Sequence, residues 1–217
     1  MTGLTIYTVG HSTRSSSEFL ALLRAHGIRR IVDVRTIPRS RHNPQFDRDR
    51  LSRSLRAAGI HYRHLPGLGG LRRPRRDSIN VAWRNANFRG FADYMQTSQF
   101  QVSLDRLLHL ARGETTAVMC AEAVPWRCHR SLIADALLVR GVAVQEAASP
   151  SKTEPHKPTP WARVQGTQVT YPATSVVERA SSRRGGAGRR AVNRGRTKGS
   201  SGLSRRPRVR RPGDDGR

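Results

Sequence analysis

The sequence predicts an α/β fold: a mostly parallel sheet of about five strands with helices on both faces. Short apolar runs rich in β-branched residues alternate with stretches whose apolar residues recur every three or four positions. Strands that alternate with helices of this length usually form a parallel sheet covered on both sides. In addition, polar residues repeatedly follow the strands, at the edge where such sheets bind ligands.

The first half of the chain contains three predicted strands and two predicted helices. Ser15–Ser17 supply an N-cap for the first helix, which ends at Gly27. The second helix covers residues 47–58 and is stopped by Gly59. The three strands are predicted at residues 6–9, 31–34 and 60–65.

The second half continues the alternation up to about residue 147. Helices are predicted at residues 88–95, 100–111 and 128–140, and strands at 115–119 and 142–144. Residues 148–172 are proline-rich and weakly patterned, with Trp161 and Tyr171 available to pack back onto the domain. We therefore expect one α/β domain over residues 1–172.

Residues 173–217 are predicted to be a disordered basic tail. They consist mainly of Arg, Gly and Ser and have too few apolar residues to offset the entropy lost on ordering. The whole chain has a net charge of +25, and 37 of its 40 basic residues are arginine. A coding bias can explain arginine in place of lysine, but not 40 bases against 15 acids. We therefore expect contact with DNA or RNA through the tail.

The sequence lacks the signals of membrane or secreted proteins. No apolar run approaches the roughly eighteen residues that a membrane-spanning helix needs. The N-terminus has neither the basic nor the apolar region of a signal peptide. Two cysteines are too few for a disulfide scaffold. We expect a cytoplasmic protein without membrane contact.

The segment from Cys120 to Arg130 carries the strongest chemical signal. Cys120 ends a predicted strand, and Cys128 is predicted to open the next helix, where the helix dipole lowers a thiol pKa. Cys128 is therefore a candidate nucleophile, with His129 or His11 as its base. Cys120 and Glu122 complete the predicted catalytic set. The alternative is that both cysteines are small buried residues without a chemical role.

Two other interpretations of this segment compete. An anion cradle of the Cys-x5-Arg type needs an arginine where Trp126 stands, and Arg127 comes one residue late in a loop without glycine. A zinc site could use both cysteines, His129 and His11. However, the adjacent side chains Cys128 and His129 should diverge on a helix, and no Cys-x2-Cys pair is present. We therefore expect no metal and no other cofactor.

The predicted binding residues come from several strand ends. Asp33 and Arg35 follow the second strand and can be a catalytic acid and an anion binder, or equally a structural ion pair. The glycine-rich segment 66–70 lets backbone approach a ligand closely, although a simple turn is its ordinary explanation. The binding residues that we predict are Ser12, Asp33, Arg35, Ser40, Gly69, Gly70 and Arg130.

These motifs together resemble the family of domains of unknown function numbered 488 (DUF488). The resemblance is strongest at Cys120-Ala121-Glu122 with Cys128-His129-Arg130, and it extends over roughly residues 4–172 but not over the tail. It implies an α/β fold and a bacterial or archaeal cytosolic setting, and it implies no particular activity. The other residues that carry it are 7–12, 33–35 with Pro38 and Ser40, 65–70, 91–95, and His156, Thr159, Pro160, Ala162, Gly166, Tyr171 and Pro172.

Three functions are compatible with these observations. The first is an enzyme whose pocket of Cys, His, Glu and Arg residues acts on a phosphate-containing substrate, a nucleotide or a nucleic acid. The second is a non-catalytic accessory protein that binds nucleic acid through the tail. The third is a thiol redox sensor that uses the two cysteines.

Overall fold

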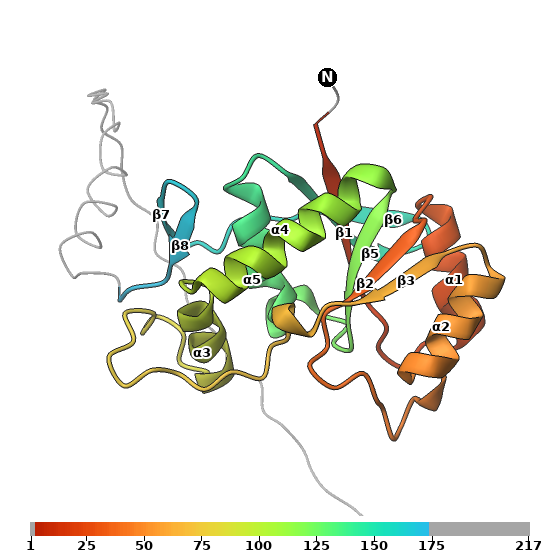
Figure 1. The fold of residues 1–217 in the computed structure, drawn as a ribbon, viewed down its shortest axis with the longest axis horizontal. Coiled ribbons are helices and arrows are strands. Elements are labelled where there is room, and N and C mark those ends of the chain that lie inside the picture. The colour runs from red at the N-terminus through yellow and green to blue at the C-terminus, as the bar shows by residue number, and fades with distance from the viewer. Residues whose placement is uncertain (1–2, 174–217) are drawn as a thin grey trace, which may run out of the picture. The chain divides into compact units, whose positions relative to one another are not determined.

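The computed structural model describes residues 3–173 and confirms the α/β class (Figure 1). A six-stranded sheet has the order β3-β2-β4-β1-β5-β6, in which the first five strands are parallel and β6 is antiparallel to β5. The strands are β1 (Thr5–Gly10), β2 (Arg30–Asp33), β3 (His61–His64), β4 (Thr116–Cys120), β5 (Ala143–Ser149) and β6 (Lys152–Pro155). The predicted set of about five mostly parallel strands is thus confirmed, with one antiparallel edge strand added.

Helices cover both faces of this sheet, as predicted. They are α1 (Ser16–Ala25), α2 (Arg48–Ala57), α3 (Ala86–Tyr94), α4 (Ser98–Gly113) and α5 (Arg130–Leu138). Residues of α1 and α2 form one buried apolar cluster, and residues of α3, α4 and α5 form another. Adjacent strand residues are divided between the clusters, since Val118 joins the second and Met119 the first. This division follows from the alternation of side chains along a strand.

Local signals place the helix ends close to their predicted positions. The Ser15 side chain accepts a hydrogen bond from the Glu18 backbone, and the Glu18 side chain accepts one from the Ser15 backbone, which forms a capping box. Gly27 and Gly59 follow α1 and α2 with φ of 62° and 71°, a backbone region that glycine enters without strain. Both ends of α1 and the C-terminal end of α2 are therefore determined by the residues beside them.

The segment after β5 contains more regular structure than predicted. It forms β6 and a separate hairpin of β7 (Arg163–Gln165) and β8 (Gln168–Thr170). The strand β6 is exposed at every position and ends at Pro155, so it lacks the apolar alternation that identifies a strand in sequence. The predicted docking of the aromatic residues is confirmed: Tyr171 is fully buried, and Trp161 packs edge-on against Trp83.

Most of the predicted tail, 174–217, lies outside the described residues. The described domain itself is strongly basic, because it contains 26 of the 40 basic residues and 12 of the 15 acidic ones. Among residues 3–173, no helix combines the length and apolar character that crossing a membrane requires.

The topology brings the ends of three central strands together. In the parallel pairs, Gly10 of β1 lies opposite Cys120 of β4, and Asp33 of β2 lies opposite Met119. The loops that follow β1, β2 and β4 therefore meet at the carboxyl edge of the sheet, where the sequence places most of its polar motifs.

Candidate active site

Backbone hydrogen bonds hold the loop after β4 against the loop after β1. His11 N donates to Cys120 O at 3.0 Å, and Ser12 N donates to Ala121 O at 2.9 Å. Gly10 lies so close to this loop that a Cβ atom on it would be 2.0 Å from Glu122 O. The residues that follow β4 are therefore fixed in position by the neighbouring strand.

Cys128 does not open a helix, and this part of the prediction is wrong. It follows the short 3-10 helix Pro125–Arg127 in an extended conformation, and α5 begins two residues later at Arg130. Because Cys128 lies outside the helix, its side chain does not diverge from that of His129. The Cys128 Sγ atom lies 3.7 Å from His129 Nδ1, so the expected divergence of these residues is also wrong.

Cys120, Cys128 and His129 form one compact group of potential ligands, which we call the thiol–imidazole cluster. Their ligand atoms all lie within 4.8 Å of one another. A hydrogen bond from Cys120, supported by His129 and Arg130, lowers the pKa of the Cys128 thiol against the effect of burial. The same hydrogen bond, together with burial, raises the pKa of Cys120. Cys128 is therefore the more acidic of the two thiols.

Arg130, one of the groups that lower the pKa of Cys128, is itself buried beside the sulfur. Its side chain is 1% exposed, and its Nε donates to Cys128 Sγ at 3.4 Å and its Nη2 to Glu122 O at 2.6 Å. Within residues 3–173 it has no carboxylate partner. A buried guanidinium without a counter-charge is costly, and the Cys128 thiolate supplies that charge.

The His129 ring is held in place by packing. A Cβ atom on Gly70 would lie 2.5 Å from His129 Nδ1, so only glycine allows the ring to approach. Phe91 contacts the ring edge-to-face, with 5.1 Å between the ring centroids. The His129 Nε2 atom is buried and has no hydrogen-bond partner among the described residues. Nδ1, by contrast, lies beside the cysteine sulfur.

The thiol–imidazole cluster lines a cavity of about 420 Å³ that we call the edge cavity. It includes six of the twelve predicted site residues: Cys120, Glu122, Cys128, His129, Arg35 and Gly70. Sequence reasoning did not assign its other polar lining residues, which are Thr36, Arg39, Asn85, Asn87 and Arg127. Arg39 and Arg127 stand beside predicted site residues and could have been found from that proximity. Asn85 and Asn87 come from the distant N-terminus of α3, and no local signal identifies them as site residues.

Asp33 and Arg35 form a buried ion pair. Asp33 is fully buried and accepts hydrogen bonds from Arg35, 2.7 Å at the shortest, and from the hydroxyl of Tyr62 at 2.7 Å. Burial opposes the charge of Arg35, but the bonds to Asp33 raise its pKa. The geometry thus corresponds to the structural alternative for Asp33, while Arg35 also lines the edge cavity.

His11 belongs to this ion-pair network. It is 2% exposed, stacks on Phe46 with 4.1 Å between the ring centroids, and lies 3.3 Å from Arg35 Nη1 through its Nε2 atom. Burial is the main cause that lowers the pKa of His11 to about 4. Among the described residues it has no hydrogen bond to either cysteine sulfur. The structure therefore gives His129, and not His11, the place beside Cys128.

The remaining predicted binding residues do not line the edge cavity. Ser12 is in a left-handed conformation with φ of 50°. Ser40 stabilises its own loop, since its backbone N–H donates to Asp47 and its hydroxyl accepts from the Asn43 backbone. Gly69 permits a close approach to Thr36. These residues shape the loops around the cavity.

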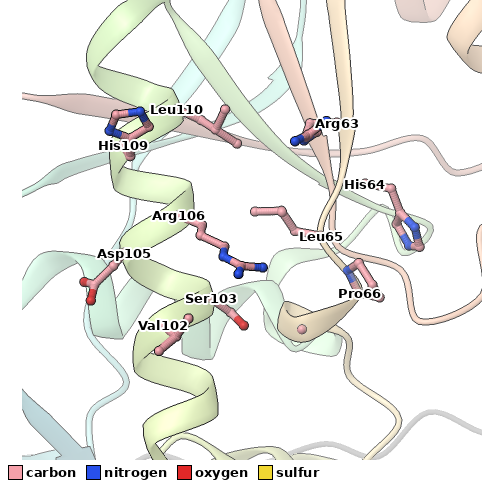
Figure 2. A pocket seen from close by; sticks show the side chains of 11 residues that line it. Arg63, His64, Leu65, Pro66, Val102, Ser103, Asp105, Arg106, His109 and Leu110 are labelled. Atoms are coloured by element: carbon pink, nitrogen blue, oxygen red, sulfur yellow. The ribbon is translucent and has the colours of Figure 1, made fainter.

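A larger cavity of about 720 Å³ lies apart from the predicted catalytic residues, between α4 and the end of β3 (Figure 2). Figure 2 shows Arg106 extending from α4 toward this cavity, and Asp105 of the same helix also lines it. Arg63 lines the opposite side. Neither arginine has an ion-pair partner in the described part of the chain. We call it the α4 cavity.

The comparison with known families agrees with these motifs. The model of a family described as "Domain of unknown function DUF488" matches residues 15–137, more than half of the chain. The chain belongs to the DUF488 family. The DUF488 match includes all three residues of the thiol–imidazole cluster, and it is shorter than the 4–172 over which the motifs resemble the family. No curated protein and no solved structure matches the chain.

Proposed function

We propose that this protein is an enzyme that acts on a phosphate-containing substrate, a nucleotide or a nucleic acid, in the edge cavity. One observation carries the proposal: a cluster of reactive side chains and three arginines line the same cavity of about 420 Å³. Guanidinium groups bind phosphate oxygens through paired, charge-assisted hydrogen bonds. A sulfur or imidazole beside such a group can act on the bound substrate.

The lining residues suggest how the work is divided. Arg39 and Arg127 are exposed, and no carboxylate pairs with them among residues 3–173, so they are available for a phosphate group. Phe88 and the amide of Asn87 also line the cavity and suit a nucleobase, which stacks on aromatic rings and bonds to amides. The thiol–imidazole cluster then faces the bond that reacts.

Glu122 is the general base in this proposal. It is exposed and lines the edge cavity, and its carboxylate accepts one local hydrogen bond, from Val124 N at 3.3 Å. A carboxylate without a buried ion-pair partner is free to accept a proton from water or from a substrate hydroxyl. It lines the same cavity as both cysteines, which supports this role.

Binding by the full chain tests the phosphate site. Titration calorimetry with inorganic phosphate, nucleotides and short oligonucleotides should find ligands whose affinity falls by about 100-fold or more in Arg39→Gln/Arg127→Gln, since each of the two missing charged hydrogen bonds costs about 1.5–3 kcal/mol. Arg53→Gln/Arg56→Gln on α2 removes the same charge from exposed positions outside the cavity and should bind as the wild type does. Equal affinities of the two double variants would refute the proposal.

A second candidate function is non-catalytic binding of nucleic acid. The net charge of +25 favours it, and so do Arg63 and Arg106 at the α4 cavity. Each arginine–phosphate ion pair that a substitution removes should reduce the slope of log affinity against log salt by about 0.9. If Arg63→Gln/Arg106→Gln lowers this slope for an oligonucleotide more than Arg53→Gln/Arg56→Gln does, the α4 cavity binds the phosphate backbone. An unchanged slope would leave the edge cavity as the functional site.

A further inference from the structure

We infer that Cys120, Cys128 and His129 bind one zinc ion and leave its fourth coordination position open toward the edge cavity. This inference deepens the proposed function, because it names the chemistry of the thiol–imidazole cluster. Metal binding itself does not depend on the identity of the substrate. The zinc site and the proposed substrate class can therefore each be wrong without the other.

The donor atoms and their spacing fit zinc. Thiolate and imidazole are the ligands that zinc prefers, and two cysteines with one histidine are a known catalytic set. Bonds of about 2.3 Å to sulfur and 2.0–2.1 Å to nitrogen place tetrahedral ligand atoms roughly 3.5–3.8 Å apart. Cys128 Sγ and His129 Nδ1 are already 3.7 Å apart, and all three donor atoms lie within 4.8 Å of one another. Only small side-chain rotations are needed to close the site.

Each ligand is positioned by a different constraint. Cys120 is held by the pairing of β4 with β1, where it lies opposite Gly10. Cys128 follows the 3-10 helix Pro125–Arg127, which leaves it extended. His129 is held between Gly70 and Phe91. A site assembled before the ion arrives loses little entropy when it binds.

Arg130 suits the role of an outer hydrogen-bond donor to a metal-bound thiolate. It donates to Cys128 Sγ at 3.4 Å from a buried position. Outer partners of this kind orient ligands and tune the metal. Two thiolates and Zn²⁺ together carry no net charge, so a hydroxide on the zinc would be the negative charge that balances the buried guanidinium.

The cluster offers three ligands, which is the number found in catalytic zinc sites. Among residues 3–173 no further Cys, His, Asp or Glu joins this group. The fourth position then holds water, whose pKa zinc lowers to about 7. In the hydrolysis of a phosphate ester, the zinc-bound hydroxide forms the new P–O bond and the ester P–O bond breaks. The leaving oxygen takes the proton that Glu122 removed from the bound water.

Cobalt spectroscopy on the full chain tests this inference directly. After chelator treatment and reduction, titration with Co²⁺ should give thiolate-to-cobalt charge-transfer bands and the strong visible bands of a tetrahedral site. They should saturate at one equivalent, and Zn²⁺ should displace the cobalt. Absence of these bands in the folded, reduced wild-type chain would overturn the inference, whatever the variants do.

Substitutions assign the ligands. Cys120→Ser, Cys128→Ser and His129→Gln should each weaken Co²⁺ binding by more than about 100-fold, and Arg130→Met by about 10- to 100-fold. His109→Gln, an exposed residue at the α4 cavity, should leave the spectrum unchanged. If the bands survive in all three ligand variants, the metal binds elsewhere and the inference is wrong.

The phosphate site is tested separately. Arg39→Gln/Arg127→Gln should retain the full cobalt spectrum while it loses affinity for phosphate compounds. Bands without phosphate binding would support the metal site and refute the proposed substrate class. Phosphate binding without cobalt bands would support the proposed substrate class and refute the metal site.

Discussion

The imidazole of His129 lies against the Cα atom of Gly70, so that a methyl group at position 70 would be 2.5 Å from His129 Nδ1. This approach joins the loop after β3 to the residue before α5. From the sequence, we expect the glycines of segment 66–70 to allow a close approach between the backbone and a ligand. At Gly70 the group that approaches is a side chain of the thiol–imidazole cluster, which links the conformation of this loop to the site.

Gly70→Ala should destabilise the protein by about 1–3 kcal/mol, because the added methyl group must displace the His129 ring in a packed region. The free energy of unfolding from urea titrations measures this cost. Gly113→Ala is the matched control, since a Cβ atom there has no neighbour within 4 Å. If the two alanine variants are equally stable, the close packing of His129 on Gly70 is wrong.

Stability should fall at alkaline pH because of His156. Its ring nitrogens bond to Asp135 at 3.0 Å and Glu146 at 2.7 Å. Burial alone would lower the pKa of His156, but these two bonds raise it to about 9. The unfolded value is about 6.5, so the stabilisation is fully present below that pH and disappears as the pH rises through about 9. The decrease can reach about 3 kcal/mol.

Unfolding free energies at about pH 6 and about pH 10 check this dependence on His156. His156→Gln should reduce the difference between the two pH values by the stated amount. His109→Gln replaces an exposed histidine on α4 and should retain the wild-type difference. A His156→Gln protein with an unaltered pH profile would show that the network does not hold a protonated histidine.

Removing the hydroxyl of Tyr171 should cost about 1–3 kcal/mol, because a buried carboxylate then loses a donor. Tyr171 is fully buried and donates to Asp135 Oδ2 at 2.8 Å. Tyr171→Phe can be compared with Tyr7→Phe by thermal and urea unfolding. The Tyr7 hydroxyl has no hydrogen bond to the part of the chain that the structure describes, so its removal should be nearly neutral. Equal destabilisation in both variants would contradict the network.

Mild peroxide should join Cys120 and Cys128 in the metal-free protein. The peroxide oxidises the Cys128 thiolate to a sulfenic acid, and the Cys120 thiol then displaces water to form the disulfide. Intact mass spectrometry should show a decrease of about 2 Da, reversed by a thiol reductant. Prior loading with Zn²⁺ should slow the reaction. In Cys120→Ser, the sulfenic acid or products with more oxygen should accumulate at Cys128 instead. If the mass of the wild-type protein does not change, a redox role of the two cysteines is excluded.

Residues close together in the chain were sufficient to predict the α/β class and the helix ends at Ser15, Gly27 and Gly59. They also predicted the succession of five parallel strands and five helices along the chain. These features depend on residues a few positions apart, through apolar periodicity, capping side chains and the freedom of glycine. The motif from Cys120 to Arg130 was recognisable for a similar reason, because its residues are close neighbours in the chain.

The assembly of the site, by contrast, depends on tertiary packing. The helix α5 starts two residues later than predicted. For this reason the side chains of Cys128 and His129 point toward one another, although they were expected to diverge. His11 joins the Asp33–Arg35 ion pair, and Asn85 and Asn87 reach the edge cavity from the distant N-terminus of α3. These relationships depend on how separate elements pack and on the backbone conformation of single residues. Neither produces a periodic or local pattern in the sequence.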